Sequence, residues 1–389
     1  MSENEVVAGG GDGDFMTVRH LTCRGSQTEI GRAQAEAAMA TYAWKPLPAE
    51  PLRARARRIW FERNWPQHAA RMRGAAAVAG VDPGSDAVFL DGLTGLPDGS
   101  ACSVTFCPPA FTEEGRGLIG RNYDFFLTSA EALFALMSGE QVEDTTPPMA
   151  SLPYVLTSVP DDGPATTLLT MNELDGCMEG VNEHGLAVAL LIADAENTGT
   201  PELAGPQVGL SSTQLPRFLL DTCATAEEAR LALLGTKQYD LGTPLHYLVA
   251  DASGDAFVWE RGRGGVEHII DANDAALCVT NHLLHRHRDL AQLPEDNAET
   301  MLTYQRYRTL RERTDRARLS GTALRETLDA VRITAANAQD YPARTLWRSV
   351  LDLGSRTMST HFYLGDDPDG APRYSEELSF SAGAAVTVP

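Results

Sequence analysis

A cysteine, an arginine and an aspartate occur within one short stretch of the chain, from Asp98 to Phe126. Cys102 follows a polar loop, and a β-prone run leads from it to a Gly-rich turn at 115–117. A second β-prone run then carries Arg121 and Asp124. Alternating apolar residues on both sides of a glycine turn are typical of a hairpin or of two neighbouring strands. We therefore expect Arg121 and Asp124 to lie beside Cys102.

These three side chains could support a sulfur nucleophile. A thiol attacks carbonyls as the thiolate, and an ordinary cysteine has a pKa near ~8.5, whereas a free α-amine titrates near ~7.7–8. A cysteine at a chain terminus therefore carries its own general base. Arg121 would favour the thiolate, and Asp124 would accept a hydrogen bond from the new ammonium. We predict that the chain is cut between Ala101 and Cys102.

Composition and charge exclude several classes of protein. The chain has 389 residues, a hydrophobic content of 43% and a net charge of −21, which is typical of a globular protein with a large core. The negative charge would repel nucleic-acid phosphates, so we expect no nucleic-acid partner. No apolar run of about eighteen residues and no signal-peptide pattern occurs, so we expect no membrane partner and assign the protein to the cytoplasm.

The cysteine and histidine spacing does not favour a metal centre. Six cysteines are scattered without CxxC spacing, and the common nucleotide, zinc-protease and serine-hydrolase motifs are absent, so we expect no cofactor and no metal. His282, His285 and His287 form a cluster, but no carboxylate pattern accompanies it. Cys107 competes with Cys102 as a nucleophile, although Pro108 and Pro109 after it suit a loop.

The element pattern divides the chain into three parts. Residues 1–14 are rich in Gly, Asp and Glu and are predicted to be a disordered tail. Residues 15–101 are predicted to be mostly helical, with helices over 28–45 and 50–80, the latter broken near Pro66. Residues 102–389 form the rest of the same globular unit.

The third part alternates between blocks of strands and blocks of helices. Strands are predicted over 152–159, 166–172, 177–181, 186–193, 246–261 and 266–281, helices over 212–235 and 298–335, and a closing hairpin over 347–364. Blocks of this kind predict an α+β fold in which two sheets are sandwiched between helical layers.

Four motifs occur together in one order, and they resemble those of a known superfamily. They are Ala101-Cys102-Ser103, Gly120-Arg121-Asn122-Tyr123-Asp124-Phe125, Val181-Asn182-Glu183-His184-Gly185-Leu186 and Val279-Thr280-Asn281-His282. The chain resembles the N-terminal nucleophile (Ntn) hydrolases of the choloylglycine hydrolase superfamily. The closer likeness is to its autoproteolytic branch, typified by acyl-coenzyme A:6-aminopenicillanic acid acyltransferase.

The resemblance implies a four-layer αββα fold and a precursor, or zymogen, that cleaves itself between Ala101 and Cys102. It implies that the fragments 1–101 and 102–389 stay together as a heterodimer. The mature enzyme would act on a small-molecule linear amide or acyl donor through an S-acyl intermediate on Cys102.

The resemblance also assigns site residues. Cys102 matches the nucleophile, and Arg121 and Asp124 match the guanidinium and carboxylate beside it. Asn281 matches the amide that helps to hold the oxyanion, and Arg306 matches a late arginine, with Arg308 as the alternative alignment.

Two positions depart from the family pattern. A backbone N–H near Ile192 would be the second oxyanion donor, where bile-salt-type relatives have Asn. Ala101 stands where Gly often precedes the nucleophile. Tyr123, Phe125 and Phe126 are candidates for the substrate-binding wall, and they suit a core equally well.

Two other readings stay open at this point. One is a binding protein on the same scaffold that is neither cleaved nor catalytic. The other is an uncleaved cysteine hydrolase in which His184 or His282 serves Cys102 as the base. A denaturing gel separates them from the first reading, which requires two fragments that meet at 101/102.

Overall fold

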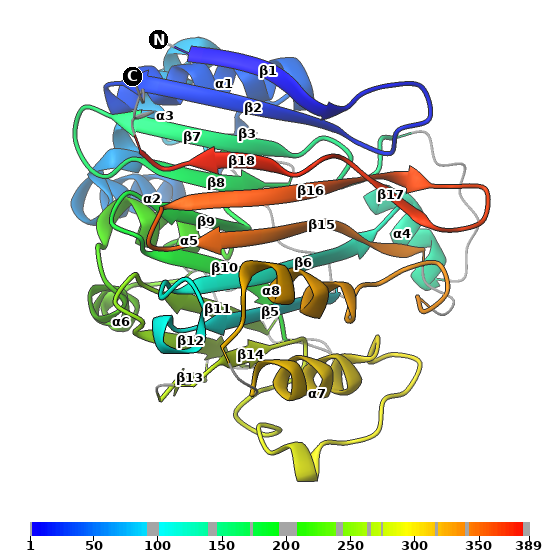
Figure 1. Ribbon diagram of the computed structural model, residues 1–389. Coiled ribbons are helices and arrows are strands. Elements are labelled where there is room, and N and C mark those ends of the chain that lie inside the picture. Colours follow the sequence, from blue (N-terminus) through cyan, green and yellow to red (C-terminus); the bar gives the residue numbers. More distant parts are fainter. Residues whose placement is uncertain are drawn as a thin grey trace, which may run out of the picture.

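Two large β-sheets with helices packed against them make up this mixed α+β protein (Figure 1). The computed structural model describes residues 2–91, 101–138, 146–171, 174–193, 208–238, 244–262, 266–273, 275–315, 318–338 and 342–383. The polar loop 98–100 before Cys102, part of the loop 126–150 and most of the loop 194–212 lie outside these ranges.

The larger sheet has nine strands among the described residues, in the order β1-β2-β7-β8-β9-β10-β11-β12-β13. The pair β2–β7 is parallel and the other pairs are antiparallel. The strands are β1 Ser2–Gly9, β2 Thr17–Gly25, β7 Tyr154–Pro160, β8 Thr166–Thr170, β9 Glu179–Asn182, β10 Ala187–Ile192, β11 Leu245–Ala250, β12 Ala256–Arg261 and β13 Glu267–Asp271.

The smaller sheet has seven strands in the described part of the chain, in the order β14-β5-β6-β15-β16-β17, with β18 also paired to β16. Its strands are β5 Ala101–Cys107, β6 Leu118–Phe126, β14 Leu277–Val279, β15 Ala343–Asp352, β16 Thr357–Asp366, β17 Pro372–Tyr374 and β18 Leu378–Ser381. A separate two-stranded ribbon pairs β3 Leu47–Pro48 with β4 Val88–Phe89.

The helices pack against different sheets. Near the nine-stranded sheet, α1 packs on β2, α5 on β9 and β10, and α6 on β11. On the seven-stranded sheet, α7 packs on β5 and β14, and α8 on β6 and β15 (Figure 1). The helices are α1 Gln27–Tyr42, α2 Pro51–Asn64, α3 Pro66–Ala79, α4 Ala130–Ser138, α5 Gln214–Thr222, α6 Ala226–Gly235, α7 Thr303–Thr314 and α8 Gly321–Asp329, with short 3₁₀ turns at Pro109–Phe111 and Leu290–Gln292.

The local signals in the sequence agree with these elements. The helix expected over 50–80 is broken at Pro66, which opens α3 because proline is tolerated in the first turn of a helix. The expected hairpin around Gly185 joins β9 to β10, and Gly185 has a φ of 82° that favours glycine. The closing hairpin is β15–β16.

The prediction of a disordered N-terminal tail is wrong for most of its length. Ser2–Gly9 forms β1, which pairs with β2 over nearly all of its residues. The composition is polar, and the strand lies at the edge of the sheet with its first five residues exposed. Long-range pairing with β2 therefore orders a segment whose side chains bury little surface.

The two predicted halves share one core. Buried side chains of β2 and α1, such as Leu21 and Ile30, belong to the same hydrophobic cluster as those of β6 and β10. Within the described residues, no helix has the length and apolar character needed to cross a membrane.

Candidate active site

The pairing of β5 with β6 assembles the centre of the site. Cys102 lies opposite Tyr123 and Val104 lies opposite Arg121, which confirms the predicted hairpin. Residues paired across antiparallel strands share a face of the sheet, and successive residues alternate between faces. The side chains of Cys102 and Arg121 therefore share the face toward the nine-stranded sheet. Asp124, opposite Ala101, lies on the other face.

Arg121 contacts the sulfur from within a buried ion pair. Its Nη2 atom lies 3.5 Å from Cys102 Sγ and 2.7 Å from the carbonyl oxygen of Leu190. Its Nη1 atom donates to the carbonyl of Met178 at 2.6 Å and lies 2.8 Å from Glu179 Oε2. Arg121 and Glu179 are both fully buried. The guanidinium is therefore shared between the sulfur and a carboxylate.

Asn281 connects the backbone nitrogen of Cys102 to strand β10. Its Oδ1 accepts from the N–H of Cys102 at 2.9 Å, and its Nδ2 donates to the carbonyl of Ile192 at 2.8 Å. Its own backbone N–H donates to Thr303 Oγ1 at 2.9 Å. The nitrogen that would become the α-amine is thus held by a side-chain amide.

The backbone of Ile192 faces this site. In β10 the N–H of Leu190 donates to Met178 on β9's side, whereas the N–H of Ala193 donates to Pro244 on β11's side. Because backbone groups alternate along a strand, the N–H and C=O of Ile192 point to the same side as those of Leu190. The contact between the Ile192 carbonyl and Asn281 agrees with this direction.

Arg306, in the first turn of α7, reaches the same point from the helical side. Its Nη1 atom donates to the carbonyl of Cys102 at 2.6 Å and to Ser103 Oγ at 2.9 Å. Its Nη2 atom donates to Asn281 Oδ1 at 2.8 Å. Arg308 is exposed, so Arg306 is the arginine that reaches the site.

Of the two carboxylate oxygens of Asp124, the described residues hydrogen-bond only one. Its Oδ1 accepts from Thr345 Oγ1, and its Oδ2 lies 3.9 Å from Arg306 Nη1. Oδ2 is buried and has no hydrogen-bond partner among the described residues. A carboxylate oxygen is thus available on the Ala101 side of the junction.

Burial opposes charge on both groups. Burial raises the pKa of the Cys102 thiol, and the Arg121 guanidinium offsets only part of this rise. Burial also raises the pKa of Asp124 to about 6, against the lowering effects of Arg306 and Thr345. Arg121 lowers the pKa of the Cys102 thiol, as expected, but burial raises that pKa by more, so the net shift in the unbroken chain is upward.

The three aromatic residues proposed for substrate binding are all buried. Tyr123 and Phe125 lie on the face of β6 that carries Arg121, and Tyr123 stacks on Trp347 with ring centroids 3.9 Å apart. The strand alternation puts Phe126 on the opposite face, with Asp124. Tyr123, which pairs directly with Cys102, is therefore the best placed of the three to line a site at the sulfur.

The competing side chains are in other surroundings. Cys107 lies on the face of β5 opposite to Cys102, in a small apolar cluster with Leu324 and Leu328, and burial raises its pKa to about 12. His184 is exposed in the β9–β10 turn.

His282 is buried, and its ring does not contact the sulfur. Its Nδ1 contacts Thr280 and Thr303, and its Nε2 contacts the carbonyl of His287. Burial lowers the pKa of His282 to about 3. This geometry does not favour a cysteine–histidine pair.

Four residues that hold the site side chains were not predicted from the sequence. Glu179 pairs with Arg121, and Ser103 accepts from Arg306. Thr303 accepts from the backbone of Asn281, and Thr345 donates to Asp124. A signal for Glu179 was present, since a carboxylate between Met178 and Val181 interrupts an apolar strand. A buried charge needs a partner, and Arg121 was already a candidate. The three hydroxyl residues carry no such local signal.

Comparison with known proteins gives one family match. The family model described as acyl-coenzyme A:6-aminopenicillanic acid acyl-transferase matches residues 111–364. No curated protein matches the chain.

Solved structures give weaker likenesses. Penicillin V acylase from Agrobacterium tumefaciens is 18% identical with a TM-score of 0.46, over 67% of this chain and 82% of that chain. A mutant of conjugated bile acid hydrolase from Clostridium perfringens is 14% identical with a TM-score of 0.45, over 72% and 96%. The N-acylethanolamine-hydrolyzing acid amidase ortholog of Caenorhabditis elegans is 17% identical with a TM-score of 0.37, over 65% and 93%.

Proposed function

We propose, from the premise that the chain belongs to the acyl-coenzyme A:6-aminopenicillanic acid acyl-transferase family, that it is a self-cleaving cysteine amidohydrolase or acyltransferase. Its substrates would be small linear amides or acyl donors. Activation would cut the peptide bond between Ala101 and Cys102, and Cys102 would then carry the acyl group as a thioester.

One observation carries this proposal. The backbone nitrogen of Cys102 is hydrogen-bonded to Asn281, while its sulfur contacts Arg121 on the other side. A nucleophile that uses its own α-amine as the base needs both atoms held at once. In the unbroken chain the buried N–H of Cys102 needs an acceptor, and a side chain supplies it rather than a neighbouring strand.

The cleavage step would begin with the thiol of Cys102. The sulfur attacks the carbonyl carbon of Ala101, the C–N bond breaks, and the released nitrogen takes up a proton. The resulting thioester is hydrolysed by water, which leaves a carboxylate on Ala101 and a free thiol on Cys102. Asp124 Oδ2, which has no hydrogen-bond partner among the described residues, would then accept from the new ammonium.

In each turnover the α-amine would take the thiol proton as the sulfur attacks an acyl carbonyl. Negative charge collects on one oxygen, where fixed donors are worth about 2.7–4 kcal/mol each. The side-chain amide of Asn281 and the N–H of Ile192 are the proposed donors. The leaving amine takes the proton, and water or an acceptor amine then releases the acyl group from sulfur.

The same reading extends to the fold and to the two fragments. We infer a four-layer αββα arrangement, supported by contacts of β5 with β10 and of β16 with β8 between the sheets, and by the helices packed on each. The fragment 1–101 supplies β1 and β2 to the large sheet, which supports a lasting association. Arg57 and Asp91 of that fragment are further tied to Gln214.

Intact mass and a denaturing gel test the cleavage. Purified protein should give two fragments with the junction between Ala101 and Cys102. Cys102→Ala should stay as one polypeptide and turn over no substrate, whereas Cys107→Ala, on the same strand but the other face, should still be cleaved. Libraries of acyl amides and acyl thioesters, with Cys102→Ala as the blank, would identify the substrate class and separate hydrolysis from acyl transfer.

Each other outcome supports a different function. An unbroken chain that hydrolyses amides would overturn the self-cleavage and favour the cysteine–histidine hydrolase. An unbroken and inactive chain that still binds acyl amides would favour the binding protein. Cleavage at another peptide bond would remove Cys102 as the terminal nucleophile.

A further inference from the structure

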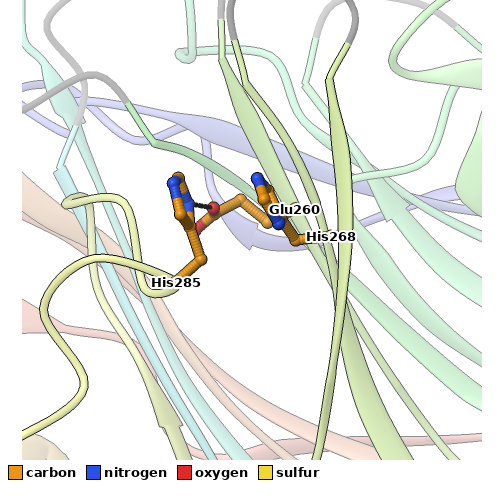
Figure 2. Close-up of side chains that lie close together, drawn as sticks. All are labelled: Glu260, His268 and His285. Carbon is orange, nitrogen blue, oxygen red and sulfur yellow. Dashed lines mark hydrogen bonds and ion pairs between the residues drawn. The ribbon is translucent and has the colours of Figure 1, made fainter.

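Three potential metal ligands converge at the β12–β13 end of the large sheet. Glu260 in β12 pairs directly with His268 in β13, so their side chains share a face. His285 comes from the segment after β14 and approaches them from the opposite side (Figure 2). In Figure 2 the carboxylate of Glu260 and the two imidazoles point toward one another.

The donor atoms are spaced closely enough for one ion. One ligand atom from each residue lies within 4.8 Å of the other two. A tetrahedral zinc ion with bonds of ~2.0–2.2 Å needs donor separations of roughly 3.4 Å, which fits inside this limit. The two imidazoles stack with centroids 3.9 Å apart and would tilt to reach that geometry. His285 is exposed, which leaves the site open for entry and for a water ligand.

Hydrogen bonds from His246 and Leu284 fix the direction of the Glu260 carboxylate. Glu260 Oε2 accepts from His246 Nε2 at 2.7 Å and from the backbone N–H of Leu284. Its Oε1 faces His285. Partners behind a ligating carboxylate fix its direction and are typical of built metal sites.

The surroundings of Glu260 differ from those of the other candidate cluster. Glu260 is fully buried, and its ion-pair partners in the described part of the chain are His246 and His285 rather than an arginine or a lysine. The other group with similar donor spacing, His68, Asp91 and Asp175, differs because Arg57 lies 2.5 Å from Asp91.

We propose that Glu260, His268 and His285 bind one divalent cation of the zinc class. Two imidazole nitrogens and one carboxylate oxygen are a donor set that zinc prefers, whereas calcium and magnesium take oxygen ligands. The proposal does not depend on self-cleavage or on the identity of the substrate. It differs from the sequence expectation of no metal, because that expectation paired His285 with its chain neighbours.

The ion would also hold the segment that carries Asn281. Glu260 is bound to His246, and His246 Nδ1 lies 3.1 Å from the carbonyl oxygen of Thr280, the residue before Asn281. Leu284 and His285 belong to the same segment. Binding would therefore tie the β12–β13 edge to residues 280–285, as a structural ion does.

The test is a zinc titration of the full-length protein after chelator treatment, with zinc chloride alone as the probe and a chromophoric chelator as competitor. We expect one zinc ion per chain at this site. His268→Asn and His285→Asn should each weaken binding at least tenfold, and the double variant should lose it. His184→Asn removes an exposed histidine elsewhere and should leave binding unchanged. Circular dichroism checks that each variant is folded.

Binding at the nucleophile must be counted separately. The titration is repeated in Cys102→Ala, where we expect the same single site. Cobalt(II) in that protein should give the visible spectrum of a four-coordinate ion without a sulfur-to-metal charge-transfer band. The proposal is overturned if no stoichiometric zinc binds, if the histidine variants keep it, or if Cys102→Ala loses it.

Discussion

The sulfur of Cys102 lies where burial opposes its ionisation. It is buried, and burial raises its pKa while Arg121, already paired with Glu179, compensates in part. A low-dielectric setting of this kind disfavours the thiolate, so the proposed chemistry would need the α-amine of Cys102 as the base. At the residue scale, the proposed chemistry therefore depends on the two carboxylates Asp124 and Glu179.

The first prediction concerns Asp124 and pH. Its pKa rises from 3.8 to about 6 in the unbroken chain, so its neutral form stabilises the fold below about pH 4, and this stability is lost as the pH rises through 6. We compare two proteins in the uncleavable Cys102→Ala background, one with Asp124 and one with Asp124→Asn. As the pH rises from 4 to 7, the free energy of unfolding of the Asn variant should increase relative to that of the Asp124 protein, by up to about 3 kcal/mol. Urea denaturation at a series of pH values measures this.

The same substitution should act in the opposite direction on the chemistry. With Cys102 present, Asp124→Asn should slow cleavage or turnover by ~10²-fold, because the new ammonium loses its anionic partner. A stability difference that does not change with pH, or an unaffected rate, would contradict the role of Asp124.

The second prediction concerns Glu179 as a positioning residue. Glu179→Gln leaves Arg121 buried without its counter-charge, which should cost about 3–5 kcal/mol of unfolding free energy. It should also shift the pH profile of alkylation at Cys102 to lower pH, since the guanidinium then acts on the sulfur alone. The exposed Glu183→Gln is the control and should change neither. Loss of stability with an unshifted profile would make Glu179 merely structural.

At the scale of elements, the N-terminal segment is held by a close crossing of α1 and α3. A Cβ on Gly31 would lie 2.0 Å from the carbonyl oxygen of Arg71, and one on Gly74 would lie 2.1 Å from that of Thr28. Two glycines thus let two helix backbones touch. Ser26 and Glu29 form a capping box that fixes where α1 begins.

The third prediction tests this crossing. Gly31→Ala should lower the unfolding free energy by about 1–3 kcal/mol or more, because the methyl group meets backbone that cannot move aside. Gly235→Ala, at the end of α6 with open space around it, should leave stability unchanged or raise it by up to about 1 kcal/mol. Denaturant unfolding measures the free energy of unfolding of both variants. If Gly31→Ala and Gly235→Ala change it equally, the close contact of α1 with α3 does not explain the glycines.

At the scale of the whole molecule, the proposed cut divides a shared sheet. β2 of the first fragment pairs in parallel with β7 of the second, and both fragments contribute to one core. Separation would break that ladder and expose apolar surface on both sides. Under the proposal, the two fragments would therefore stay associated through this sheet and core after cleavage.

The fourth prediction follows from mass action. If cleavage makes two chains, unfolding also separates them, so the melting temperature should depend on protein concentration. A shift of roughly 2 °C per tenfold change in concentration is expected from an unfolding enthalpy of ~0.7 kcal/mol per residue. Cys102→Ala should show no such dependence. Size-exclusion chromatography should give one native species for both proteins, and separated fragments would contradict the assembly.

The sequence by itself determined the features that depend on local periodicity. Alternation around the Gly-rich turn was enough to predict the β5–β6 hairpin and the approach of Arg121 to Cys102. Pro66 and Gly185 marked a helix start and a turn because each restricts or permits the backbone directly. The family resemblance, which the family match confirms, also came from short motifs in order.

Only the tertiary structure decided what depends on pairing between distant segments. Strand pairing ordered β1 against β2 and put Asp124 on the face away from the sulfur. The packing of α7 selected Arg306 rather than Arg308. Contacts between distant segments brought Glu179 to Arg121 and His268 to His285. These contacts join residues up to 204 positions apart in the chain, and no local propensity encodes them. They follow from which strands become neighbours and from the need of each buried charge for a partner.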